Sequence, residues 1–116
     1  MATVHEVRAL ALSLPETEEQ EHGGKPSFRV RDKIYAVIQP DQVSLVIKTT
    51  EEDRQAYTTL DPEVFQVPGS FSRLAYMMVR IDRIEMDELR QLLVKAWKLV
   101  APKRLVKAYE AMQPLL

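Results

Sequence analysis

Three short segments rich in apolar residues follow one another between residues 27 and 48 and are separated only by brief turns. Residues 27–31 alternate apolar and basic side chains, residues 34–38 are continuously apolar, and residues 43–48 alternate again. Such patterns are typical of β-strands. Because the connections are too short for the crossover that parallel neighbours need, the strands are expected to pair antiparallel. This stretch therefore predicts an antiparallel sheet at the centre of the fold.

Helix signals flank this sheet on both sides. Thr3 and Glu6 have the spacing of a capping box, and Pro15 ends the first predicted helix. Thr50 is the expected N-cap of a short helix that opens with three acidic residues. A broad apolar stripe from Leu89 to Val100 predicts the longest helix, and Pro102 suits the first turn of a separate last one.

The order of these elements predicts an α+β fold. One or two further strands are expected within residues 64–67 and 76–81, so the antiparallel sheet has four to five strands. We expect the helices to pack on one side of it, with one helix at the N-terminus and two at the C-terminus. The length of 116 residues fits a single domain over residues 1–116.

The composition leaves few options for chemistry. The chain has no cysteine and only two histidines, His5 and His22, and no spacing matches a metal motif. No nucleophile or phosphate-loop motif is present, so we assign no catalytic residue, metal or cofactor and expect a protein that is not an enzyme. Gly23 and Gly24 could wrap an anion, or simply form a turn. No apolar run is long enough to span a membrane, and we expect a cytoplasmic protein.

Several segments together resemble the MmcQ/YjbR-like family of small bacterial proteins over roughly residues 3 to 112. They are His22 to Val30 with Asp32 to Ala36, Asp41 to Lys48, Phe65 to Pro68, Met78 to Asp82, and Glu88 to Leu105. The resemblance implies a CyaY-like α+β fold with a double-wing arrangement, and it implies DNA binding. Members often carry His, Gly and Trp before the strand at 76–81, whereas residues 69–76 here read Gly-Ser-Phe-Ser-Arg-Leu-Ala-Tyr.

The net charge of −1 is unevenly distributed, since residues 25–50 hold five basic and two acidic side chains. If the apolar positions of the strands face the core, the cations predicted to share the outer sheet face are Arg29, Arg31, Lys48 and Arg80. Such a face would attract phosphates. Ordinary solvated positions are the alternative. Lys103, Arg104 and Lys107 form a second basic cluster on the last helix, which could bind phosphates or be a solvated face.

We therefore expect a non-enzymatic binding domain of the MmcQ/YjbR-like type that contacts DNA through the basic sheet face. Aromatic side chains for base stacking are few, with Tyr35, Phe71 and Tyr76 as the candidates. The alternative is a protein-interaction or small-ligand domain that uses the sheet face or the 69–76 loop, and an enzyme with a non-standard site stays open. The protein partner and the biological process are unknown, and the state is expected to be a monomer or a small homo-oligomer.

Overall fold

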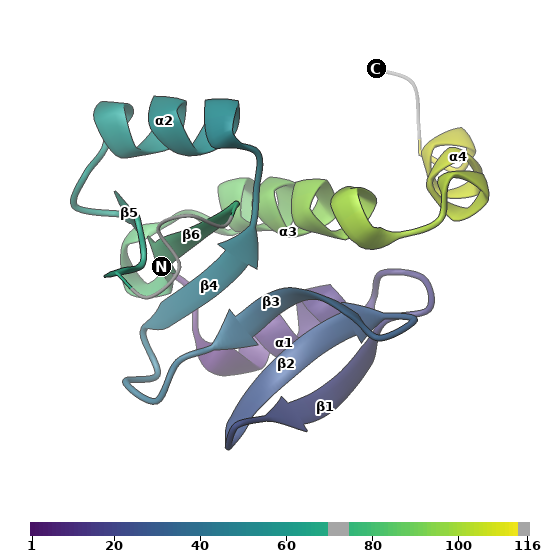
Figure 1. Ribbon diagram of the computed structural model, residues 1–116, viewed down its shortest axis with the longest axis horizontal. Coiled ribbons are helices and arrows are strands. Elements are labelled where there is room, and N and C mark those ends of the chain that lie inside the picture. Colours follow the sequence, from purple (N-terminus) through teal and green to yellow (C-terminus); the bar gives the residue numbers. More distant parts are fainter. Residues whose placement is uncertain (70–74, 114–116) are drawn as a thin grey trace.

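The structure, a computed structural model, describes residues 1–69 and 75–113. Figure 1 shows its helices and strands. In chain order they are α1 (Val4–Leu12), β1 (Glu18–His22), β2 (Lys25–Val30), β3 (Lys33–Ile38), β4 (Ser44–Lys48), α2 (Glu51–Leu60), β5 (Phe65–Gln66), β6 (Tyr76–Arg80), the 3-10 helix η2 (Ile81–Arg83), α3 (Met86–Val100) and α4 (Lys103–Ala111).

The six strands form one sheet in the order β1-β2-β3-β4-β6-β5, and every neighbouring pair is antiparallel. Helices α1 and α3 lie against one face of this sheet (Figure 1). Helix α2 contacts β5 at one edge, and α4 follows the C-terminal end of α3 away from the strands (Figure 1). The predicted α+β class and the one-sided packing of helices on an antiparallel sheet are therefore confirmed.

The prediction of four to five strands was too low, because the acidic stretch after α1 forms an edge strand. Residues Glu18–His22 pair with β2 although all five are exposed, so they carry no apolar pattern that would indicate a strand. The hairpin turn creates the pairing: Gly23 and Gly24 have φ of 59° and 83°, as a two-residue turn between twisted strands requires. The acidic side chains also discourage a further strand from adding to this edge.

The turn between β2 and β3 lies one residue earlier than Asp32-Lys33, where the sequence places it. Arg31 and Asp32 occupy the two central positions, with φ of 50° and 68°. A bulge in the same hairpin shifts the register between Phe28 and Arg29 and leaves Tyr35 as the extra residue. Arg31 therefore stands outside the alternation of β2 and does not share a face with Arg29.

Both predicted N-caps are present. Thr3 and Glu6 form the complete capping box of α1, and the Thr50 hydroxyl accepts the amide of Asp53 at the start of α2. Leu60 and Met112, which helical spacing would place among the core contacts, are instead exposed by 81% and 82%. Both lie at the C-terminal end of a helix, since Leu60 is the last residue of α2 and Met112 is the C-cap residue after α4.

The core lies between the sheet and helices α1 and α3. Trp97 of α3 is fully buried, as predicted, and its Nε1 donates to the Pro15 carbonyl at 2.9 Å. Tyr35 is buried on the same side, and its hydroxyl donates to the Ala11 carbonyl at 3.2 Å. Burial raises the pKa of Tyr35 to about 12, although a hydrogen bond with Thr17 opposes the rise. These contacts tie the segments around α1 and α3 to one face of the sheet.

Candidate functional site

The sheet face opposite α1 and α3, called the open face below, is identified from strand alternation and register. Ser27, Val37, Val46 and Met78 lie in one row across β2, β3, β4 and β6, because each is the register partner of the next. Residues two positions away on each strand share this face. They are Glu18, Gln20 and His22 of β1, Lys25 and Arg29 of β2, Ser44 and Lys48 of β4, and Tyr76 and Arg80 of β6; Ile34 of β3, opposite Arg29, and Gln39, two residues after Val37, lie there as well.

Two of the predicted cations, Arg29 and Lys48, lie on the open face. The Nη2 of Arg29 donates to Ser27 Oγ at 2.8 Å, while its Nε is buried and has no hydrogen-bond partner among the described residues. The Nζ of Lys48 lies 5.2 Å from the ring centroid of Tyr76, a cation–π contact between neighbouring strands. Neither cation forms an ion pair within residues 1–69 and 75–113.

Arg31 and Arg80 are not free cations of this face. Arg31 points from the turn to Glu16, after α1, with Nε and Oε1 3.2 Å apart. Arg80 is on the open face but donates twice to Asp82, at 3.0 and 2.8 Å. The hydrogen bond from Arg80 holds the pKa of Asp82 below its usual value, so the carboxylate stays charged and matches the guanidinium. The predicted set of four cations is therefore reduced to two.

The cluster of Lys103, Arg104 and Lys107 is on α4, and all three side chains are exposed. Helix α4 packs through Tyr109 on Trp97, with ring centroids 5.1 Å apart, and through an ion pair between Glu110 and Lys98. Both partners belong to α3, beyond the core from the open face. The two predicted basic regions are thus separate surfaces.

Lys25 is a third cation of the open face and was not among the predicted residues. Its Nζ donates to Oε1 of Gln39 at 3.3 Å, and no ion pair to it is found in the part of the chain that the structure describes. The predicted strand began at Ser27, after Pro26, and therefore excluded Lys25. Strand β2 begins at Lys25, which shares a face with Ser27 and Arg29. Lys25, Arg29 and Lys48 are called the open-face cations below.

Elsewhere, ion pairs join acidic and basic side chains from different parts of the chain. Glu16 pairs with Arg31, Asp53 with Lys95 at 3.9 Å, and Glu63 with Arg83 at 3.8 Å. Exposed pairs of this kind contribute little stability, but they cancel charge locally. On the open face, Glu18 is the cross-strand neighbour of Arg29, while Lys25 and Lys48 lie opposite His22 and Tyr76, which are not acidic.

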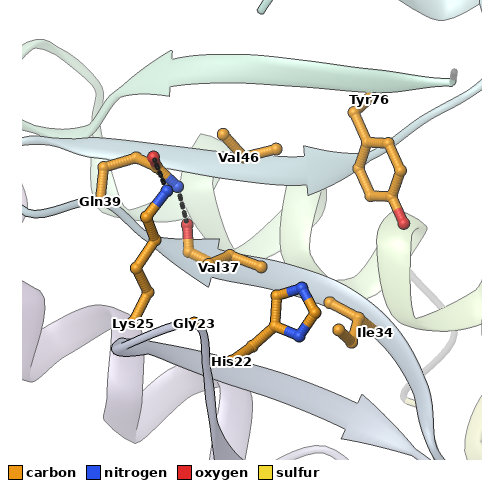
Figure 2. Close-up of a pocket in the computed structure, with 8 residues that line it drawn as sticks. All are labelled: His22, Gly23, Lys25, Ile34, Val37, Gln39, Val46 and Tyr76. Atoms are coloured by element: carbon orange, nitrogen blue, oxygen red, sulfur yellow. Dashed lines mark hydrogen bonds between the residues drawn. The ribbon is translucent and has the colours of Figure 1, made fainter. Parts of the chain in front are cut away.

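A pocket of about 320 Å³ lies at the hairpin end of the open face. Figure 2 shows the imidazole of His22 and the ring of Tyr76 projecting from opposite sides, with Ile34 and Val37 between them. Val46, Gly23, Lys25 and Gln39 complete the lining. Gln39 is held in place because its Nε2 donates to the Val37 carbonyl at 3.2 Å while its Oε1 accepts from Lys25 (Figure 2). The pocket therefore combines an apolar floor with polar groups at its rim.

The other candidates place little chemistry at this face. Gly23 and Gly24 form the β1–β2 turn, and Tyr35 is buried on the helix side. Phe71 and most of the 69–76 loop lie outside the described residues. Within the described ranges, no group of three or more His, Asp or Glu residues is placed to hold a metal ion, and no helix has the length and apolar character needed to cross a membrane.

Comparison with known proteins identifies relatives of this chain. The family model described as YjbR matches residues 12–99, in agreement with the resemblance seen in the sequence. The crystal structure of Deinococcus radiodurans protein DR2400, whose family-model domain is DUF419, is similar in fold with a TM-score of 0.78. That likeness covers 98% of this chain and 91% of that one at 23% identity. No curated protein matches the sequence.

Proposed function

The chain belongs to the YjbR family, and we propose that it is a non-enzymatic domain that binds single-stranded DNA on the open face of its sheet. The observation that carries the proposal is the combination of open-face cations with an apolar, partly aromatic floor. Cations attract the phosphates, and the floor suits bases that are not already paired. This role is consistent with the DNA binding that the family resemblance implies. It is also consistent with the cytoplasmic location expected from the sequence.

The apolar floor favours a single strand over a duplex. In a duplex the bases are stacked and paired, so Ile34, Val37 and Tyr76 would face phosphates and sugars that gain little from apolar contact. In a single strand each base has a free π-face that can stack on an aromatic ring or lie on an apolar surface. A four-stranded sheet surface that carries such side chains is a known solution for single-strand recognition.

A small-ligand domain is the second candidate, and the pocket of about 320 Å³ is the observation that favours it. Its volume falls at the lower end of the range of about 300–1,000 Å³ that small-molecule sites occupy. A free ligand would use the pocket alone, whereas a DNA strand would also need Arg29 and Lys48, neither of which lines the pocket.

The salt dependence of binding tests the proposal. Three phosphate contacts predict a log–log slope of about −2 on a single strand, because each contact contributes about −0.7. Fluorescence anisotropy of a labelled 12-nucleotide strand, measured across a salt series, gives this slope, and a duplex of the same length should bind more weakly at each salt concentration. Absence of binding at low salt, or tighter binding of the duplex, would count against the proposal.

A further inference from the structure

The pocket on the open face has features that phosphate attraction alone does not require. Phosphate contacts need only exposed cations, whereas here a half-open pocket is bordered by two rings and by a side-chain amide that is hydrogen-bonded in place. We propose that this pocket holds one unstacked nucleobase of the bound strand, with an adjacent phosphate of the strand at Lys25. The inference rests on the proposed function, and it adds a base-recognition site to a surface otherwise defined by charge.

The size of the pocket fits one nucleotide. A volume of about 320 Å³ is at the small end of ligand sites, so a single planar ring with its sugar can enter but a stacked run of bases cannot. The remaining bases would lie along the row of Val46 and Met78 toward β6. One base would therefore contribute more to binding than its neighbours.

The walls suit a planar ring. His22 and Tyr76 project from opposite sides of the pocket, and the side chains of Ile34 and Val37 form the apolar floor between them (Figure 2). Aromatic side chains stack on the faces of unpaired bases, and apolar side chains exclude water from the same faces. Tyr76 also contacts Lys48 through its ring, so the cation that holds a neighbouring phosphate helps to orient this wall.

Gln39 supplies hydrogen bonding for the edge of the base. Its amide has two donor hydrogens and an acceptor oxygen with two lone pairs. One hydrogen is used by the Val37 carbonyl and one lone pair by Lys25, so a donor and an acceptor remain. Because both existing bonds hold the amide in place, these remaining groups are presented in a fixed direction. Lys25 keeps two of its three donor hydrogens for the phosphate.

A strand without bases separates this inference from the proposed function. The test compares a 12-nucleotide thymidine strand with a fully abasic strand of the same length, which carries the same phosphates. We expect the wild-type protein to bind the thymidine strand about tenfold more tightly, the effect typical of one stacked base. The double variant His22→Ala/Gln39→Ala should lose most of this preference, because one wall and the side-chain amide are removed, and its affinity for the abasic strand should change much less than its affinity for the thymidine strand.

The control is Arg29→Gln, which lies outside the pocket lining and should weaken the binding of both strands by the same factor. Equal wild-type affinity for the two strands would overturn the base pocket and the role of the apolar floor, while the binding of single-stranded DNA through the open-face cations would stand. Failure of both strands to bind at low salt would overturn the proposed function as well. Binding of free thymidine monophosphate as tightly as the strand would also overturn the inference, because the pocket would then serve a free nucleotide.

Discussion

Replacing Lys25 and Lys48 together by glutamate should lower the affinity for a single DNA strand by about sixtyfold at 50 mM salt. Each phosphate contact contributes about −0.7 to the log–log slope, so it raises the affinity roughly eightfold when the salt concentration falls from 1 M to 50 mM. The factors for two lost contacts multiply to about sixtyfold. Anisotropy titrations across the salt series should also show the slope fall from about −2 to about −0.7, because Arg29 alone remains.

The matched control is Lys103→Glu/Lys107→Glu on α4, which changes the net charge by the same amount. These side chains are exposed on a separate surface, so the affinity should change by less than about twofold and the slope should not change. Equal losses from the two double variants would mean that only overall charge matters. A loss from the α4 variant alone would move the site to α4, where the sequence analysis placed its second cluster.

Truncation of Trp97 to alanine should cost about 3–5 kcal/mol of unfolding free energy. The side chain is fully buried, packs on Tyr109, and donates to the Pro15 carbonyl, so the change leaves both a cavity and an unpaired acceptor. This loss is a large part of the roughly 5–15 kcal/mol that stabilises a domain. Urea unfolding followed by far-ultraviolet circular dichroism measures it without relying on the tryptophan that is removed.

Leu99 provides the control on the same helix. Its side chain is 44% exposed, so Leu99→Ala should cost clearly less, within about 1 kcal/mol. The variant Trp97→Phe should fall between the two, since it keeps an aromatic ring but leaves the Pro15 carbonyl without its donor. If Trp97→Ala unfolds at the same urea concentration as Leu99→Ala, the result contradicts the burial of the Trp97 side chain in the core.

Local signals in the sequence predicted much of the fold. The structure contains the predicted caps at Thr3 and Thr50 and the predicted strands within residues 27–48. These features depend on residues that are close together in the sequence, so the sequence pattern was enough to predict them. The edge strand β1 could not be found in this way, because Glu18–His22 has no apolar periodicity. Its strand conformation depends on the Gly23-Gly24 turn and on pairing with β2, which is a property of the hairpin and not of the segment.

The candidate site was predicted less well, because the direction of a side chain depends on details of the turns. A turn that begins one residue earlier removed Arg31 from the sheet face. The sequence did contain a signal for the pairing of Arg80, since alternation placed Asp82 on the same side two residues later. Lys25 would have been included if the predicted strand had begun before Pro26. Proline within strands is confined mostly to edges and first residues, so the sequence favoured a later start.

The pocket illustrates a different limit. Its lining comes from β1, β2, β3, β4 and β6, from the β1–β2 turn and from Gln39 just after β3. No two of these segments form a sequence motif that indicates a binding site. His22 and Tyr76 are more than fifty residues apart in sequence and line one pocket only because the sheet order places β1 and β6 on either side of three strands. Long-range register of this kind is set by tertiary pairing.

Contact between the open face of the sheet and single-stranded DNA can be observed residue by residue. The isotope-labelled protein is titrated with a 12-nucleotide strand, and the backbone amide signals are followed in two-dimensional NMR. The largest shifts should fall in Lys25–Val30, Ser44–Lys48 and Tyr76–Arg80, while the signals of α4 should remain unchanged. Shifts concentrated in Lys103–Ala111, or no shifts at low salt, would contradict this contact.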